Sequence, residues 1–181
     1  AGVSEMNVTV GLPRLIEILD ARKTPSTPLM EVYLEKEFNN EKESRIIAEK
    51  IKEVRLREII SEIKIDFANK KIEIELDPKS LKTVHAGAQK IVERLQEKGF
   101  SVKGNDLKII LNASDMDYKA MYKLKEKLKD TIVSGVKGVS QVVVVNRGRD
   151  YVVITSGSNL SEIINIKGVD KDKIFSNDIH D

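Results

Sequence analysis

The order in which strand-like and helix-like patterns follow each other along residues 59–154 constrains the fold of this chain most. Apolar residues alternate with polar ones, as in half-buried strands, in three segments: residues 63–67, 72–76 and 107–111. Two stretches repeat apolar residues at helical spacing instead: residues 78–98 and 118–132. Two β-branched runs follow, residues 141–145 and 151–155, and the first suggests a central strand. The predicted order is therefore β-β-α-β-α-β-β.

Helices that alternate with strands in this way predict an α+β fold, with a mixed or antiparallel sheet and helices packed on one face. Asp77 and Pro78 predict the start of the first helix, because Asp caps helices and Pro is tolerated at the first helical position. Gly99 predicts its end. A single helix between these limits has one apolar stripe: Leu81, Val84, Ala88, Ile91, Val92 and Leu95. We expect residues 56–155 to fold as an independent unit.

A further amphipathic helix is predicted over residues 12–22, ahead of this sheet. Pro13 suits its first turn, and four apolar residues form its stripe: Leu12, Leu15, Ile16 and Leu19. Residues 24–28 contain two prolines, which predict a stiff, extended connector. The remaining predicted elements are one strand and two helices, at residues 30–35, 41–54 and 160–164. A polar tail is expected after them.

The composition excludes several classes of protein. With 181 residues, the chain can form one or two domains with a real core. Cysteine is absent, which excludes disulfides and cysteine-ligated zinc or iron–sulfur sites. No apolar run approaches the length of a membrane span, so we expect a soluble, cytoplasmic protein that meets no membrane. The net charge of +2 does not signal nucleic-acid binding, which would have to come from local clusters.

Residues that could carry catalysis are sparse. His85 and His180 have no acidic or serine partner at a catalytic spacing, which favours ordinary surface roles for both. Two aspartate pairs could suggest a Mg²⁺ site, but one stands at a predicted helix start and the other in a turn: Asp115 with Asp117, and Asp170 with Asp172. No glycine-rich loop opens a helix to hold phosphates. The sequence therefore predicts no catalytic and no metal-binding residue.

Two basic clusters are the candidate nucleic-acid contacts. One lies on or just after the first predicted helix: Arg14, Arg22 and Lys23. The other is a row at i, i+4 and i+8 on the exposed side of a later helix: Lys119, Lys123 and Lys127. Such rows can neutralise phosphates, although most are simply solvated faces, and Arg14 could instead pair with Glu17. These patterns alone predict an α+β module that binds nucleic acid or serves as an adaptor.

Two terminal stretches add a family resemblance. Residues 7–28, with Gly11-Leu12-Pro13-Arg14 followed by Ala21-Arg22 and Thr24-Pro25-Ser26-Thr27-Pro28, resemble the segment after the trigger loop in the largest subunit of cellular RNA polymerases. The proline-rich form is similar to the archaeal subunit, which is split in two; this part belongs to its C-terminal piece, A-double-prime. Near the other end, Gly157-Ser158-Asn159-Leu160 and Gly168-Val169-Asp170 resemble the family's return from the jaw into the cleft.

The resemblance implies a division into cleft residues 1–55, a jaw at residues 56–130 and a return into the cleft over residues 131–181. It implies a non-catalytic part of DNA-directed RNA polymerase, a nucleotidyltransferase, that helps to hold downstream double-stranded DNA. Its partners would be that DNA and the other polymerase subunits. The isolated chain would be inactive and would bind no cofactor, because another subunit holds the catalytic Mg²⁺.

The resemblance also implies that this sequence is a fragment. The substrate-contacting residues of the trigger loop would lie upstream of Ala1, and the family pattern would continue past Asp181. One departure is visible in the second stretch. The family usually has Thr-Arg where this chain has Asp172-Lys173, so the lysine here lacks the planar guanidinium of that arginine.

Overall fold

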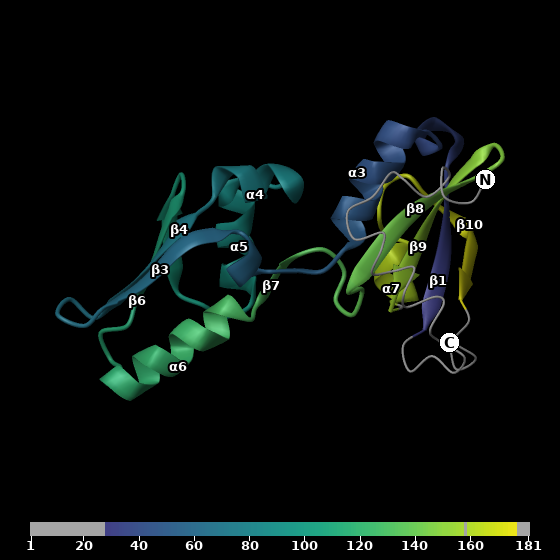
Figure 1. The fold of residues 1–181 in the computed structure, drawn as a ribbon. Coiled ribbons are helices and arrows are strands. Elements are labelled where there is room, and N and C mark those ends of the chain that lie inside the picture. The colour runs from purple at the N-terminus through teal and green to yellow at the C-terminus, as the bar shows by residue number, and fades with distance from the viewer. Residues whose placement is uncertain (1–27, 158, 177–181) are drawn as a thin grey trace. The chain divides into compact units, whose positions relative to one another are not determined.

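The computed structural model describes residues 28–157 and 159–176, which belong to two compact units. One unit is Val54–Ser134, and the other combines residues 28–53 with 135–176 (Figure 1). Each unit has its own antiparallel four-stranded sheet and its own helices. The predicted α+β class is therefore confirmed. Within the described ranges no helix is long and apolar enough to cross a membrane.

The unit Val54–Ser134 is built around an antiparallel sheet with the strand order β3-β4-β6-β5. A separate two-stranded ribbon pairs β2 with β7, at the ends of this unit. Its elements, in chain order, are β2 (Val54–Arg55), η2 (Leu56–Glu58), β3 (Ile60–Asp66), β4 (Lys71–Leu76), α4 (Pro78–Thr83), α5 (Ala88–Glu97), β5 (Val102–Asn105), β6 (Lys108–Asn112), α6 (Tyr118–Lys129) and β7 (Ile132–Ser134).

One face of this sheet is buried and the other is open. Apolar and polar residues alternate along β4, so that Ile72, Ile74 and Leu76 all point into one core. Three helices contribute further buried residues to this core: Leu81, Ile91, Val92, Leu95, Met121 and Leu128. Each such side chain contributes roughly 1.5–3 kcal/mol of hydrophobic stabilisation. Polar side chains such as Glu75 and Lys108 occupy the opposite face of β4 and β6. The helices therefore pack on one face, as predicted.

The single helix predicted between Asp77 and Gly99 is wrong, because the structure has two helices there. Helix α4 ends at Thr83, and α5 begins after Gly87. His85, between them, has a left-handed backbone (φ 54°), which a continuous helix cannot contain. Both helices bury their apolar residues in the same core. The apolar stripe in the sequence therefore continues past the break, and its spacing does not reveal that the helix is interrupted.

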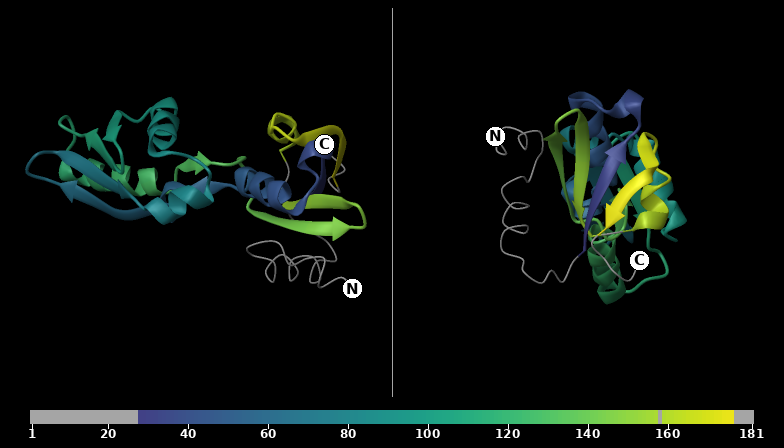
Figure 2. Two further views of the ribbon diagram at one scale, coloured as in Figure 1. Left: turned by 90° about the horizontal axis from the view of Figure 1, so that it is seen from above. Right: turned by 90° about the vertical axis from the view of Figure 1, so that its right-hand side faces the viewer.

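The second unit has an antiparallel sheet with the order β10-β1-β9-β8, whose strands lie side by side in the right-hand view of Figure 2. Helices α3 and α7 cover one face of it, where they join a core with residues such as Val32, Val144 and Val153. Its elements are β1 (Leu29–Leu34), η1 (Lys36–Phe38), α3 (Glu41–Ile51), β8 (Gln141–Arg147), β9 (Asp150–Ser156), α7 (Leu160–Ile163) and β10 (Val169–Ser176).

Three expectations about this region were wrong. Strands β8 and β9 do not extend the sheet of the first unit, because β9 forms its ladder with β1, so residues 56–155 are not one unit. Among the described strands β8 lies at the edge of its sheet rather than in the centre, although both of its faces are buried. The expected polar tail contains β10, which pairs with β1.

Two glycines of the second terminal motif occupy tight backbone positions. Gly157 has φ +102°, and its N–H donates to the carbonyl of Pro28 at 2.7 Å. A Cβ there would lie 1.9 Å from the carbonyl oxygen of Gly138. Gly168 has φ +97°, and a Cβ there would lie 2.8 Å from the ring of Phe38. The motif therefore places backbone where side chains do not fit.

Candidate nucleic-acid interface

Helix α6 presents a basic and aromatic surface. Its apolar residues Met121, Leu124 and Leu128 recur at helical spacing and face the core. The outer side exposes Tyr118 and Tyr122, at 61% and 57%, together with the lysine row: Lys119, Lys123 and Lys127. We call these five exposed residues the α6 face. Aromatic rings beside lysines are the side-chain types that contact nucleotides and phosphates.

Helix α6 carries a large excess of positive charge. Its sequence contains five lysines and one glutamate, which give it a net charge of +4. Within the described residues neither Lys119 nor Lys123 has a carboxylate partner. Lys127 Nζ lies 5.7 Å from the centroid of the Phe100 ring. The three lysines of the row extend over about 12 Å, because a helix rises by about 1.5 Å per residue.

The N-terminal end of α6 is held by its cap and by the β3–β4 turn. Asp117 accepts a hydrogen bond from the N–H of Ala120 at 2.7 Å, which caps the helix. The rings of Tyr118 and Phe67 meet edge to face, with centroids 4.9 Å apart. In the same turn Asp66 accepts bonds from the backbone and side chain of Asn69, and these bonds lower the pKa of the Asp66 carboxyl. Any stability that they contribute is present at neutral pH and is lost as acid protonates Asp66.

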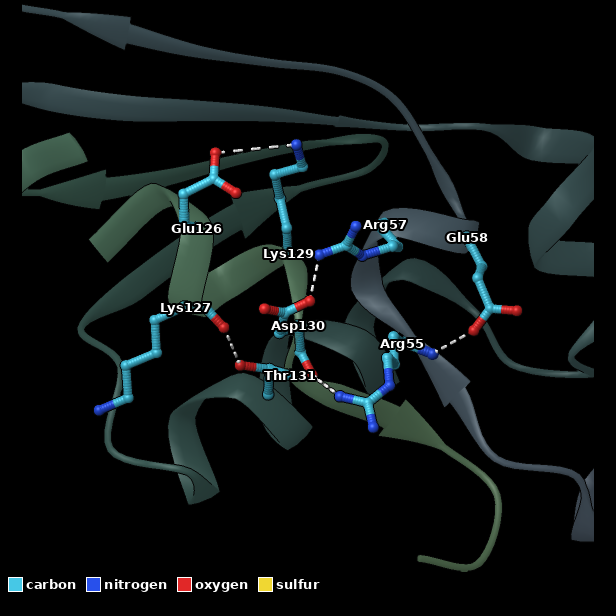
Figure 3. A network of polar contacts seen from close by, with 8 residues as sticks. All are labelled: Arg55, Arg57, Glu58, Glu126, Lys127, Lys129, Asp130 and Thr131. Atoms are coloured by element: carbon cyan, nitrogen blue, oxygen red, sulfur yellow. Dashed lines mark hydrogen bonds and ion pairs between the residues drawn. The ribbon is translucent and has the colours of Figure 1, made fainter. Parts of the chain in front are cut away.

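The C-terminal end of α6 is fastened to the segment around η2 (Figure 3). The Arg55 guanidinium donates to the carbonyl of Asp130 at 2.7 Å, and Arg57 pairs with the carboxylate of Asp130. Thr131 donates its hydroxyl to the carbonyl of Lys127 at 2.7 Å. Cations beside the last carbonyls also suit the helix dipole. This network fixes the end of the helix that carries Lys127.

We expect Arg55→Met to destabilise the unit Val54–Ser134 by about 1–2 kcal/mol, because it removes a charged donor from a helix-end carbonyl. Arg57→Met is the matched control and should cost under about 1 kcal/mol, since it removes an exposed ion pair. Urea unfolding, with hydrogen exchange at residues 127–131, measures both effects. If neither substitution lowers the free energy of unfolding measurably, this role for Arg55 is contradicted.

The structure describes three of the six residues that the sequence offers as candidate nucleic-acid contacts. Lys119, Lys123 and Lys127 are exposed on one helix, as their spacing predicted. The other three candidates lie outside the described residues: Arg14, Arg22 and Lys23. Tyr118 and Tyr122 were not predicted as part of this surface, although each directly precedes a lysine of the row. That repeated Tyr-Lys pair was the signal that could have identified them.

In each aspartate pair that could have suggested a metal site, one side chain has a structural role. Asp117 caps α6, and the Asp170 side chain accepts from the N–H of Asp172 at 3.1 Å. Among the described residues no three His, Asp or Glu side chains gather where they could hold a metal ion. The candidate nucleic-acid interface remains the α6 face, with its exposed lysines and tyrosines.

Two comparisons with known proteins agree with the terminal motifs. The family described as "RNA polymerase Rpb1, domain 5" matches residues 1–181, and the chain belongs to this family. The DNA-directed RNA polymerase subunit Rpo1C of Methanocaldococcus jannaschii is 38% identical over 183 residues. That alignment covers 99% of this chain and 21% of the relative, so the chain spans about a fifth of the relative's length. The predicted resemblance to the archaeal largest subunit is confirmed.

Proposed function

We propose that this chain is a structural part of a DNA-directed RNA polymerase and that its α6 face helps to hold downstream double-stranded DNA. The family match over residues 1–181 supports the first part and disfavours a stand-alone adaptor. The observation that carries the second part is the α6 face, where exposed lysines stand beside two exposed tyrosines, and where Lys119 and Lys123 have no carboxylate partner in the part of the chain that the structure describes. Lysines that neutralise phosphates give affinity without reading sequence, as a moving polymerase requires.

In this proposal the chain binds DNA, and its partner subunits carry out catalysis. The other polymerase subunits hold the catalytic Mg²⁺ and supply the chemistry, in the cytoplasm, so the isolated chain does not turn over nucleotides. Residues 56–130 act as the jaw, and residues 1–55 and 131–181 act as the cleft segments that attach it. Arg14, Arg22 and Lys23 remain candidate contacts to DNA or to neighbouring polymerase segments.

A deletion of the unit Val54–Ser134 tests the proposal, because the backbones on either side of it are close together. A Cβ on Gly135 would lie 2.9 Å from the Cα of Glu53. The bonds from Val136 N–H to the Ile51 carbonyl, at 2.9 Å, and from Glu53 N–H to the Val139 carbonyl, at 2.8 Å, tie the two segments. A short Gly-Ser linker can therefore replace residues 54–134.

A polymerase reconstituted with this deletion should still extend RNA on a preformed scaffold. Its elongation complexes should dissociate faster than the wild type, with a weaker dependence on salt, because phosphate contacts are lost. Unchanged lifetimes across a salt series would contradict DNA holding by this unit. Failure of the subunits to assemble would also contradict it, and would assign the unit to assembly instead.

A further inference from the structure

Three exposed aromatic side chains form a line at one end of α6. The exposed fraction is 43% for Phe67 of the β3–β4 turn, 61% for Tyr118 and 57% for Tyr122. The rings of Phe67 and Tyr118 have centroids 4.9 Å apart and an interplanar angle of 65°. Tyr122 follows Tyr118 by four residues, so both side chains lie on one side of the helix, with Cβ atoms about 5–6 Å apart. We call these three residues the aromatic line.

Packing inside the unit Val54–Ser134 does not explain the aromatic line. The core of this unit takes Met121, Leu124 and Leu128 from α6, and neither tyrosine. The contact between Phe67 and Tyr118 supports the turn, but it leaves Tyr118 more than half exposed. Of the six large apolar side chains exposed in the part of the chain that the structure describes, three belong to this line. Such a concentration is typical of an interaction surface.

The proposed duplex holding accounts for the lysines of the α6 face and not for its rings. Lysines attract the phosphates of any nucleic acid. In a duplex each base is stacked between its neighbours, so the flat faces of the bases are closed to an aromatic side chain. In a single strand these faces are free, and stacking on an aromatic ring strengthens binding by about tenfold per base.

Lysines lie beside the aromatic line along α6. Lys119 directly follows Tyr118, and Lys123 directly follows Tyr122. Lys125 also places its Nζ 5.7 Å from the centroid of the Tyr122 ring. The line is roughly 10 Å long, which gives room for about two or three bases at the ~3.4 Å rise of a stacked strand. Rings for the bases and cations for the phosphates are the two parts of surfaces that bind single strands.

We infer that the aromatic line binds single-stranded nucleic acid, with unpaired bases stacked on its rings and phosphates beside Lys119 and Lys123. A neighbouring protein surface suits the line less well, because lysine is depleted at the centres of protein interfaces. The inference rests on the proposed function in one respect, since both place nucleic acid on the α6 face. They differ in what they need: duplex holding needs the charges, and binding of a single strand needs the rings as well.

A comparison of two strands of equal charge tests the inference on the full chain. Fluorescence anisotropy at low salt measures the binding of a labelled thymidine oligonucleotide of about twelve nucleotides, and of an abasic strand of the same length. We expect the thymidine strand to bind at least about tenfold more tightly, because the abasic strand keeps the phosphates and lacks the bases. Equal affinities, or no binding of either strand, would overturn the inference. The proposed duplex holding is tested separately, by the lifetimes of elongation complexes, and neither result decides the other.

Substitutions on and off the aromatic line give a second test. Tyr122→Leu removes one ring and leaves the contact between Phe67 and Tyr118 in place. It should lower the affinity for the thymidine strand about fivefold or more, without changing the affinity for the abasic strand. Lys123→Gln should instead weaken the binding of both strands by the same factor. Phe175→Leu, which removes an exposed ring outside the line, is the matched control and should change neither affinity.

The outcomes of this second test separate stacking from other roles of the rings. Equal losses for Tyr122→Leu and Phe175→Leu, or no loss for either, would contradict stacking on the aromatic line. If Tyr122→Leu instead loses binding to another polymerase subunit, and the wild type shows no preference for the thymidine strand, the rings belong to a protein interface and the inference is wrong. Circular dichroism checks that each variant is folded. If a variant unfolds, the comparison of the two strands on the wild type decides.

Discussion

Gly157→Ala is expected to destabilise the chain by about 3 kcal/mol or more. Its φ of +102° is a backbone conformation that L side chains rarely adopt. The new Cβ would lie 1.9 Å from the carbonyl oxygen of Gly138, a backbone atom that cannot turn aside as a side chain can. The neighbouring backbone is also held, because Gly157 donates to Pro28 and accepts a bond from the Thr155 hydroxyl at 2.9 Å. Urea unfolding followed by circular dichroism measures the loss.

Gly148→Ala is the matched control for this prediction. Gly148 also has a positive φ, +67°, but beyond its chain neighbours no atom lies within 4 Å of the place that an added Cβ would take. Its substitution should therefore cost only the backbone strain, about 1–2 kcal/mol. A loss for Gly157→Ala no larger than that for Gly148→Ala would show that the close approach of the Gly138 carbonyl has no energetic weight.

The double substitution Lys119→Glu with Lys123→Glu should shorten the lifetime of the elongation complex about tenfold or more. It turns two phosphate-neutralising charges into repelling ones on the face that we propose to lie beside DNA, and electrostatics dominates such affinity. The lifetime is measured in reconstituted polymerase as the decay of transcript-extending complexes after addition of competitor DNA. The effect should be largest at low salt, because salt screens the repulsion.

A matched charge reversal on the opposite side of the same sheet serves as the control. Lys64→Glu with Lys108→Glu changes the net charge by the same amount, on strands β3 and β6 and away from α6. It should leave the lifetime close to that of the wild type. Equal shortening by both pairs would mean that total charge, and not the α6 face, determines how the complex holds DNA.

The sequence predicted those parts of the fold that depend on local periodicity. The alternation of Ile72, Ile74 and Leu76 predicted β4, and Asp117 followed by the spacing of Met121 and Leu128 predicted α6. The break at His85 could not be predicted from periodicity, because both helices bury their stripes in one core. Gly87 was the available signal for it.

The wrong predictions for the second unit concern the pairing of strands that are far apart in the sequence. Strand β10 has charged residues at four of its eight positions and buries only Val169, so its sequence resembles a polar tail until it pairs with β1. Strand β8 is apolar on both faces, which is typical of central strands, yet β9 is the one described strand beside it. Local sequence does not specify which strands become neighbours.

In the candidate site, too, local features were predictable from the sequence and long-range contacts were not. The helical spacing of Lys119, Lys123 and Lys127 predicted their common face, because it is a local property. The fastening of α6 by Arg55 and Arg57 joins residues more than 70 positions apart, and no local pattern encodes it. The family resemblance predicted the polymerase assignment from the terminal motifs and left the geometry of α6 to the structure.

Photo-cross-linking from α6 tests the central proposal most directly, because it reports position rather than affinity. An aryl-ketone cross-linker replaces Tyr122, which is 57% exposed, and in a second variant it replaces Glu75 on the open face of the sheet. Both variants are assembled into elongation complexes with labelled downstream DNA and irradiated. The account predicts cross-links from position 122 to the downstream duplex and far fewer from position 75. No cross-link from position 122, or equal yields from both positions, would contradict it.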